Sequence, residues 1–375
     1  METTVLSGLE LTKWQRDFMK SYVRESGFAP YMGTSEMDII HVKNDLKTDG
    51  YTIRIPLLLD LQSEGVKGNE RLSGNEEALD TYYFDVSWDY YRHGVETSKK
   101  EREKSAQNLL AAKRPLLRTW ASEKIKYQII ENFHKMGTVK FTDADSAARN
   151  AWLVANADRV LFGNALSNHS SGNHATSLGN IDTTNDKFSY KSVSLLKRRA
   201  KNAYPRIRPY KTGTQGREYF VLFMHPRSFR DASEDDKILA ANKDARPRDV
   251  SSNPIFQDGD LIYKGVIMRE ITELEVAKFS SDVNTETTLV DVGNGTTDVS
   301  VNFLCGCQAL AYVNKEMPTP TAKSEDDYGF FKGVGIEMAH GIEKVQWANN
   351  PSGHLGNIRK DFGMVTAYFS AEPDA

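Results

Sequence analysis

The stretch from Tyr51 to Val95, YTIRIPLLLDLQSEGVKGNERLSGNEEALDTYYFDVSWDYYRHGV, places two patterned segments on either side of a charged middle. The alternating apolar residues are Tyr51, Ile53, Ile55 and Leu57 in the first segment and Tyr82, Phe84, Val86 and Trp88 in the second. Apolar residues at every second position are typical of a β-strand with one buried face. The stretch therefore predicts a long hairpin that carries the charged middle at its tip.

The charged middle, VKGNERLSGNEEAL from Val66 to Leu79, is rich enough in glycine to suggest a phosphate-binding loop. Such a loop needs glycines at the start of a helix, followed by Lys and by Ser or Thr at a fixed spacing. Gly65, Gly68 and Gly74 are not followed by Lys-Ser or Lys-Thr, and acidic residues stand where a phosphate would be repelled. We therefore interpret these glycines as turn residues at the hairpin tip.

Length and composition set broad limits on what the protein can be. The 375 residues suffice for two domains or for one large core with long excursions. With 48 Lys and Arg against 51 Asp and Glu, the formal charge is −3, so no general basic field marks a dedicated nucleic-acid-binding protein. We expect no membrane segment and no signal peptide, because no apolar run approaches a span of about twenty residues.

Outside the hairpin, helical and strand patterns mix without regular βαβ alternation, which predicts an α+β fold. Helices are predicted at 9–25, at 98–136 and, with an Asp cap, at 143–162, and Pro115 must either kink the second or begin another. Two further helices are predicted at 194–204 and 232–242, and strands at 217–226, 260–271, 287–293, 300–314 and 363–372. The Ser/Asn-rich segment at 163–187 is predicted to be a loop or a mobile excursion.

Residues that could hold a metal are few. Cys305 and Cys307 lie two apart on a predicted strand, where they supply only half of a zinc site, so we interpret them as small buried residues. His169 and His174 would need a third ligand from elsewhere in the chain. No hydrolase or nucleotide-binding motif occurs, so we expect no catalytic residue and no cofactor, although a metal-dependent enzyme using the two histidines is kept as a hypothesis.

A basic segment, KRRAKNAYPRIRPYK at 197–211, interleaves cations with Tyr204 and Tyr210. Such a segment can contact phosphates and stack on bases, and Lys197, Arg198 and Arg199 are its candidate nucleic-acid contacts. A solvated helix face or a subunit contact explains it equally well. A nucleic-acid-binding protein that uses 197–211 is therefore the alternative function.

Several segments of the chain resemble one known family. They are WQRDFMKSYVRESGFAPYMG at 14–33, VKGNERLSGNEEALDTYYFDVSWDYYRHGVE at 66–96, YFVLFMHPRSFRDASED at 219–235 and NPIFQDGDLIYKGVIMREI at 253–271. These segments are similar to the major capsid proteins of tailed bacteriophages with the Hong Kong-type fold, typified by N4-like podoviruses. The similarity spans most of the chain, whereas 163–187 resembles an insertion or a variable surface.

The resemblance implies a division of the chain. The implied regions are an N-terminal arm at 1–47, an extended hairpin loop at 48–97, a spine helix with the first part of a peripheral domain at 98–187, an axial domain at 188–320 and the C-terminal part of the peripheral domain at 321–375.

The resemblance also implies a structural function rather than catalysis. Copies of the chain would form hexameric and pentameric capsomers of an icosahedral shell around double-stranded DNA, assembled in the host cytoplasm with a portal and with scaffold or decoration proteins. The expected assembly contacts are Trp14, Phe18 and Tyr22 in the arm and Glu70, Arg71, Glu76 and Glu77 at the hairpin tip. Apolar anchors and mixed charges suit contacts between subunits.

Overall fold

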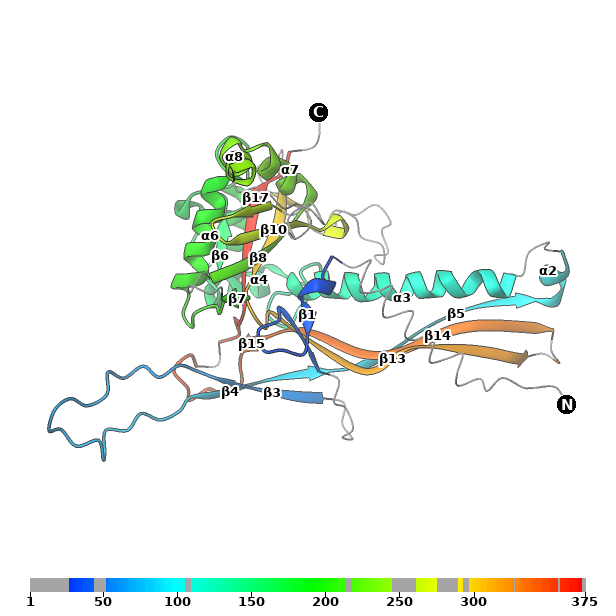
Figure 1. Cartoon of the computed structure of the whole chain (residues 1–375), viewed down its shortest axis with the longest axis horizontal. Helices are drawn as coiled ribbons and strands as arrows, with labels where there is room; N and C mark the ends of the chain where they lie inside the picture. The colour runs from blue at the N-terminus through cyan, green and yellow to red at the C-terminus, as the bar shows by residue number, and fades with distance from the viewer. Residues whose placement is uncertain are drawn as a thin grey trace.

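The computed structural model describes residues 27–43, 52–104, 109–212, 218–244, 261–274, 289–292, 297–326, 328, 330–356 and 358–372. These parts form an elongated molecule with a body built on one large sheet, a long arm in which a helix lies over strands, and a hairpin that points away from the arm (Figure 1). Within the described ranges, no helix is both long and apolar enough to cross a membrane.

The body contains an eight-stranded sheet in the order β6-β17-β12-β8-β10-β9, with β11 beside β12 and β7 beside β8. Its strands are β6 (Val160–Phe162), β7 (Lys211–Thr212), β8 (Glu218–Met224), β9 (Leu261–Tyr263), β10 (Val266–Glu270), β11 (Leu289–Val292), β12 (Thr297–Cys305) and β17 (Met364–Ser370). Phe220 and Val221 of β8 belong to different buried clusters, one on each face of the sheet. This burial on both faces explains why β8 is continuously apolar from Tyr219 to Met224 instead of alternating.

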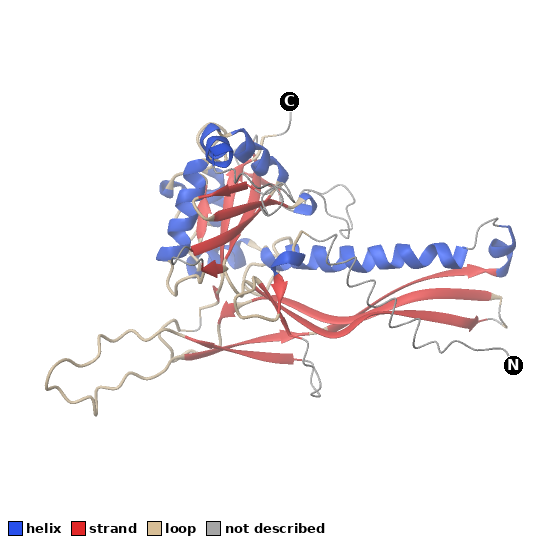
Figure 2. Cartoon of the chain, in the orientation of Figure 1, coloured by secondary structure: helices blue, strands red, loops and turns tan. Residues whose placement is uncertain are grey.

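Helices cover both faces of the body sheet, as Figure 2 shows. They are α4 (Ser146–Ala155), α5 (His174–Gly179), α6 (Tyr190–Asn202), α7 (Pro226–Glu234) and α8 (Asp236–Asp244), with 3₁₀ turns η2 (Leu166–Asn168) and η4 (Thr272–Leu274). Val193 and Leu196 of α6 join the cluster of Phe220, whereas Trp152 of α4 joins the cluster of Val221. The sheet is thus enclosed between two helical layers.

The arm combines helix α3 (Leu109–Phe133) with a five-stranded sheet in the order β1-β2-β13-β14-β5. Its strands are β1 (Met32–Gly33), β2 (Ile40–Lys43), β5 (Asp89–Ser98), β13 (Leu310–Asp326) and β14 (Phe331–Lys344), with η1 (Ala29–Tyr31) before β1 and α2 (Lys99–Lys104) after β5. Tyr91 and Val95 of β5 pack into the core beneath α3, and the ring of His93 stacks on Trp120 at 4.8 Å. The odd-numbered residues of β5 therefore face the helix, and the even-numbered ones face away.

The hairpin forms a separate two-stranded sheet of β3 (Thr52–Leu58) and β4 (Thr81–Ser87), which pair from Thr52 with Ser87 to Leu58 with Thr81. This pairing confirms the predicted hairpin. Tyr82, Phe84 and Val86 are buried in a cluster with Trp347 of the short ribbon formed by β15 (Gln346–Trp347) and β16 (Lys360–Asp361). The apolar alternation in the sequence thus identifies the face of β4 that packs on the molecule.

An ion pair is buried where the arm meets the body. Lys344, the last residue of β14, is 2.9 Å from Asp361 of β16, and their side chains are 1% and 2% exposed. The Asp361 carboxylate also accepts hydrogen bonds from Gln346 Nε2 at 2.9 Å and Trp152 Nε1 at 3.2 Å. Burial lowers the pKa of Lys344, and the neighbouring carboxylate opposes that shift. Elements from the arm, the ribbon and the body are therefore tied to one buried carboxylate.

The predicted helices hold in part. Helix α3 runs through Pro115, which therefore does not begin a second helix, although α3 starts later than predicted and residues 105–108 lie outside the described ranges. The Asp cap is confirmed, because Asp145 accepts a hydrogen bond from the Ala148 N–H at 2.7 Å. The prediction of helix up to residue 162 is wrong, because Val160–Phe162 forms β6 and pairs in parallel with β17. The predicted helix at 9–25 lies outside the described residues.

Two segments that were each predicted to form one strand form two strands in the structure. The segment at 260–271 forms β9 and β10, joined by Lys264 and Gly265, which both have positive φ. The segment at 300–314 is divided at Gly306, where a side chain would meet the Arg208 carbonyl oxygen at 2.1 Å. Cys305 therefore ends β12, and Cys307 lies in the turn before β13 instead of farther along one strand. Both are buried as predicted, and burial raises the pKa of both thiols.

Each of the two sheets takes strands from more than one of the regions that the resemblance implies, and the division into domains stays a prediction. β13 begins at Leu310 and lies in the arm sheet, although 188–320 was expected to be one domain. β17, within 321–375, pairs with β12 in the body sheet. The chain crosses between arm and body more often than its sequence suggests, because these pairings join strands that are far apart in sequence.

The Ser/Asn-rich segment at 163–187 is packed rather than a simple excursion. It carries η2 and α5, and the Asp186 carboxylate accepts hydrogen bonds from the Asn164 N–H at 2.7 Å, Asn168 Nδ2 at 2.9 Å and the Asp182 N–H at 3.0 Å. A single buried carboxylate thus organises a segment whose composition indicates a loop.

Candidate functional site: the projecting loop and the basic helix

The loop at 59–80 joins β3 to β4 and extends well beyond the body, as Figures 1 and 2 show. Gly65, Gly68 and Gly74 have φ values of 70°, 71° and 93°, the left-handed region that glycine adopts without strain. No helix starts in this loop. Its glycines therefore serve as turn residues, as the sequence indicates, and its geometry is not that of a phosphate loop.

The charged residues at the tip divide into two kinds. The Glu77 carboxylate accepts hydrogen bonds from the N–H groups of Gln62 at 2.6 Å and Ser63 at 2.8 Å, which closes the loop. These backbone donors hold the pKa of Glu77 below its ordinary value. The Glu76 carboxylate accepts from the Gly74 N–H at 2.7 Å. Glu70 and Arg71 are exposed, so they are the members of the predicted set best placed for a contact with another molecule.

The loop also exposes apolar side chains. Leu61, Leu72 and Leu79 are 65%, 58% and 56% exposed, and Leu58 at the end of β3 is 55% exposed. A single exposed leucine is ordinary, but several on one projecting loop are typical of a surface that another chain covers. The contacts predicted from sequence in this loop were all charged residues, although the leucines stand in the same stretch. Trp14, Phe18 and Tyr22, the other predicted assembly contacts, lie outside the described residues.

The base of the hairpin is held by the segment that follows β15. Asn349 and Asn350 donate side-chain hydrogen bonds to the carbonyl oxygens of Tyr83 and Thr81 at 3.1 and 3.0 Å. The Leu355 N–H donates to the Tyr82 hydroxyl at 2.9 Å. The direction of the hairpin is thus fixed at its base, whereas the loop beyond it extends freely.

The basic helix α6 uses most of its predicted contacts within the protein. Lys197 Nζ donates to the carbonyl oxygens of Glu218, at 3.3 Å, and Lys264, and Arg199 donates to the Ala157 carbonyl at 3.2 Å. Arg198 is exposed. Of the three cations predicted to contact nucleic acid, two therefore stabilise the fold.

The tyrosines of the basic segment are also engaged inside the molecule. Tyr210 is buried, and its ring packs on Tyr31 at 5.5 Å. Tyr204 packs edge-on against His354 at 5.8 Å. Neither ring is presented as an open stacking platform for bases, so the nucleic-acid role of 197–211 stays a prediction.

The two histidines of the metal hypothesis lie around one aromatic ring. The rings of His169 and His174 both approach Phe162 edge-on at 5.8 Å, and His174 Nε2 lies 3.3 Å from the Tyr368 hydroxyl. Burial lowers the pKa of His174 to about 4. Among the described residues, no group of three or more His, Cys, Asp or Glu side chains is placed to hold a metal ion. The metal-dependent enzyme thus has no site in this part of the chain.

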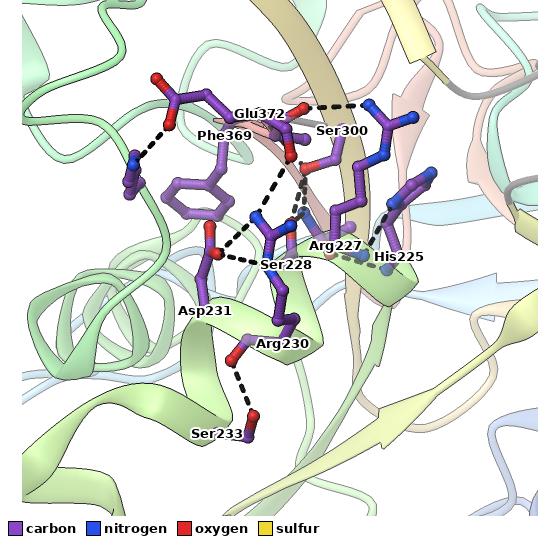
Figure 3. Close-up of polar contacts among 12 residues, drawn as sticks. His225, Arg227, Ser228, Arg230, Asp231, Ser233, Ser300, Phe369 and Glu372 are labelled. Atoms are coloured by element: carbon purple, nitrogen blue, oxygen red, sulfur yellow. Dashed lines mark hydrogen bonds and ion pairs between the residues drawn. The ribbon is translucent and has the colours of Figure 1, made fainter. Parts of the chain in front are cut away.

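A polar cluster that the sequence analysis did not identify lies at the start of α7 (Figure 3). The Ser228 and Ser300 hydroxyl oxygens are 2.6 Å apart, and Asn302 Nδ2 donates to Ser228 at 3.2 Å. His225 Nδ1 accepts a hydrogen bond from the Arg227 N–H at 3.2 Å, and burial lowers its pKa to about 4. A hydroxyl beside an imidazole can form a nucleophilic site, but His225 Nδ1 caps helix α7 and does not activate a hydroxyl.

The arginines of α7 connect the same cluster to the end of the described chain. Arg227 donates to Asp298 at 2.9 Å and to the Ala371 carbonyl at 3.2 Å, and Arg230 donates to the Glu372 carbonyl at 3.1 Å (Figure 3). The carboxylates of Asp298 and Asp231 pair with Arg227 and Arg230, and that of Glu372 pairs with Lys187. The cluster anchors β17 and the residues that follow it to α7, and it is structural.

Comparisons with known proteins place nearly the whole chain among phage capsid proteins. A family model described as phage capsid protein matches residues 2–372. The major capsid protein of Pseudomonas phage KPP25 is 25% identical over 383 residues, which cover 98% of this chain and 96% of that protein. A structure titled cyanophage Pam1 capsid asymmetric unit is 34% identical with a TM-score of 0.81, covering 94% of each chain.

A structure titled capsid of Ralstonia phage GP4 is 19% identical with a TM-score of 0.67, covering 92% of this chain and 90% of that one. At this identity the likeness supports the fold alone. The α+β architecture is thus the Hong Kong-type fold of tailed-phage capsid subunits, as the resemblance implied. The chain belongs to the phage capsid protein family. It is a structural subunit of the phage head and a component of the virion, and it is not an enzyme.

Proposed function

We propose that copies of this chain form hexameric and pentameric capsomers of an icosahedral shell around double-stranded DNA, and that the loop at 59–80 contacts a neighbouring copy. The observation that carries the proposal is the projection of this loop from the body, with Leu61, Leu72 and Leu79 more than half exposed (Figure 1). Covering such side chains on a neighbour would stabilise the shell by about 1 kcal/mol or more for each leucine.

The two sheets support an assignment of domains. The arm of α3 with β5, β13 and β14 suits the peripheral domain, and the body on the eight-stranded sheet suits the axial domain. The hairpin β3-β4 suits the extended loop between subunits. A portal, scaffold or decoration proteins, assembly in the host cytoplasm and an N4-like podovirus origin complete the proposal, and they rest on the resemblance of the quoted segments.

Electron microscopy of the purified recombinant protein tests the proposal. We expect closed shells or ring-shaped capsomers, because each copy carries both the projecting loop and the surface that receives it. Sedimentation under the same conditions measures the fraction of protein in shells. Protein that stays monomeric and never enters shells, even with its own scaffold, would contradict the proposal.

Charges at the loop tip give a finer test. Reversal of Glu70, Arg71, Glu76 and Glu77 together should impair shell assembly more than folding of the isolated subunit. The cleanest variant is Glu70→Lys with Arg71→Glu, because both side chains are exposed and the net charge is kept. We expect about a threefold or greater loss of shell yield by sedimentation, with stability changed by less than about 0.5 kcal/mol.

The matched comparison is Glu77→Lys alone, which removes the carboxylate that closes the loop onto Gln62 and Ser63. This variant should alter the loop itself and make its backbone amides exchange faster with solvent. If the Glu70 and Arg71 variant loses assembly and subunit stability to the same extent, the tip stabilises its own subunit and does not contact a neighbouring copy.

A further inference from the structure

The two strands on either side of β14, β5 and β13, differ along the edge that faces away from β14. β5 pairs with β14 from Asp89 to Ser98 without a register shift, and among the described residues no strand pairs with its other edge. β13 pairs with β2 only over 310–313, and beyond this it carries Pro318, Pro320 and bulges. Proline and bulges prevent an edge strand from pairing with another chain. One edge of the arm is thus blocked, and the other is open.

The hydrogen-bond pattern shows which residues the open edge presents. The Lys99 N–H donates to the Phe330 carbonyl at 2.8 Å, and this bond continues the pairing of β5 with β14. Backbone groups alternate in direction along a strand, so odd-numbered residues of β5 bond to β14 and even-numbered ones direct N–H and C=O to the edge. The Tyr90 N–H is already bonded to Asp89 Oδ1 at 2.7 Å, which leaves the edge from Arg92 to Glu96.

The side chains along this edge are self-complementary in charge. Arg92, Gly94 and Glu96 lie on the face away from α3, where they line a shallow depression together with Gly333 and Gly335. If a second β5 lies antiparallel about Gly94, Arg92 of each copy stands opposite Glu96 of the other. Opposite charges directly across an antiparallel pair stabilise it, and glycine at the centre lets the backbones approach.

We infer that the β5 edges of two copies pair antiparallel across a two-fold axis of the shell, centred on Gly94. The inference rests on the proposed function, since a closed shell supplies two-fold axes, and it names the partner surface as the same strand of a second copy. Directly opposite pairs, Arg92 with Glu96 and Gly94 with Gly94, would each exchange two hydrogen bonds. The two arm sheets would become one continuous sheet.

The arm leaves room for this arrangement. Helix α3 packs mainly on β14, one strand in from the edge. In the paired sheet, the two β14 strands would be three strand spacings apart, about 14 Å. Helices pack at about 8–10 Å between axes, so two α3 helices fit side by side without collision. Lys113 Nζ donates to the Glu96 carbonyl at 3.4 Å, and that oxygen keeps a second lone pair for an incoming N–H.

A charge-exchange experiment on full-length protein tests the inference. Arg92→Glu alone and Glu96→Arg alone each place like charges opposite across the axis, so each should raise the concentration needed for shells about fivefold. An equimolar mixture of the two variants restores two Glu–Arg pairs and should assemble as well as wild type. Each variant chain has the same internal contacts in the mixture as it has alone, and Glu96→Arg lacks the 3.1 Å ion pair with Lys323 in both cases, so recovery on mixing reports the contact between copies.

Crosslinking gives a second measurement. A Cβ added at Gly94 would make only ordinary contacts, with the Val334 carbonyl oxygen at 3.6 Å and Gly335 Cα at 3.8 Å, so Gly94→Cys fits the strand. It should form a disulfide between two copies in shells, because hydrogen-bonded partners lie about 5.5 Å apart at Cα. Thr321→Cys, on the blocked strand β13, is the control and should not crosslink. A mixture no better than the average of its variants, together with no crosslink at residue 94, would overturn the inference. Wild type that forms no shells would instead count against the proposed function.

Discussion

Asp361→Ala should lower the free energy of unfolding of the subunit by about 3–5 kcal/mol, because it leaves the Lys344 ammonium buried without its partner. The two side chains are 1% and 2% exposed, so solvent does not screen the pair. Gln346 Nε2 and Trp152 Nε1 would also lose their acceptor. Chemical denaturation of the isolated subunit, followed by tryptophan fluorescence, measures the change.

Two further variants separate burial from charge. Lys344→Met with Asp361→Leu removes both charges and should be more stable than Asp361→Ala alone, because neither side chain then needs a polar partner. Glu131→Ala removes a surface carboxylate 2.7 Å from Lys140 and should cost less than about 1 kcal/mol. Similar losses in Asp361→Ala and Glu131→Ala would show that the buried pair does not hold the junction.

Replacement of residues 60–79 by Asn-Gly should abolish shell formation and leave the subunit folded. The Leu59 N–H donates to the Asp80 carbonyl at 3.1 Å, so the strands are already placed for a two-residue turn. The deleted residues are mostly exposed, and a shorter loop costs less closure entropy, so stability should change by less than about 1 kcal/mol. Sedimentation and electron microscopy measure assembly, and denaturation measures stability.

The matched control keeps the loop length and replaces Leu61, Leu72 and Leu79 with Ser. If apolar contact with a neighbour drives assembly, this variant should also lose most shells, while its unfolding midpoint stays near wild type because these leucines are exposed in the subunit. Normal shells from the shortened protein would exclude the loop as an assembly contact.

The parts of the fold that sequence could predict are those determined by near neighbours. The hairpin followed from apolar residues at every second position in β3 and β4, and the cap of α4 followed from Asp145 before a helical run. β8 was recognised from its continuous apolar run. In each case the pattern of burial or capping lies within a few residues of the element it defines.

The parts that could not be predicted depend on distant partners. Val160–Phe162 continues a helical pattern, yet it forms a strand because β17, some two hundred residues later, offers a parallel edge. Lys197 resembles a solvent-facing cation, yet it bonds to carbonyl groups that β8 and the turn before β10 bring to α6. For the candidate site, sequence located the loop and its charges, whereas only the structure separated Glu77, which closes the loop, from Glu70 and Arg71.

One strand path joins the hairpin to the far end of the arm. β4 and β5 follow each other with only Trp88 between them, and the path from Thr81 to Ser98 spans about 60 Å at about 3.3 Å per residue. Its first half pairs with β3 and its second half with β14, so both ends are held by different neighbours. An extended strand cannot lengthen, so a pull on the hairpin of one subunit is carried as tension to α2. In a ring of subunits, each such strand would transmit tension from the contact at its hairpin to the contacts at the far end of its arm.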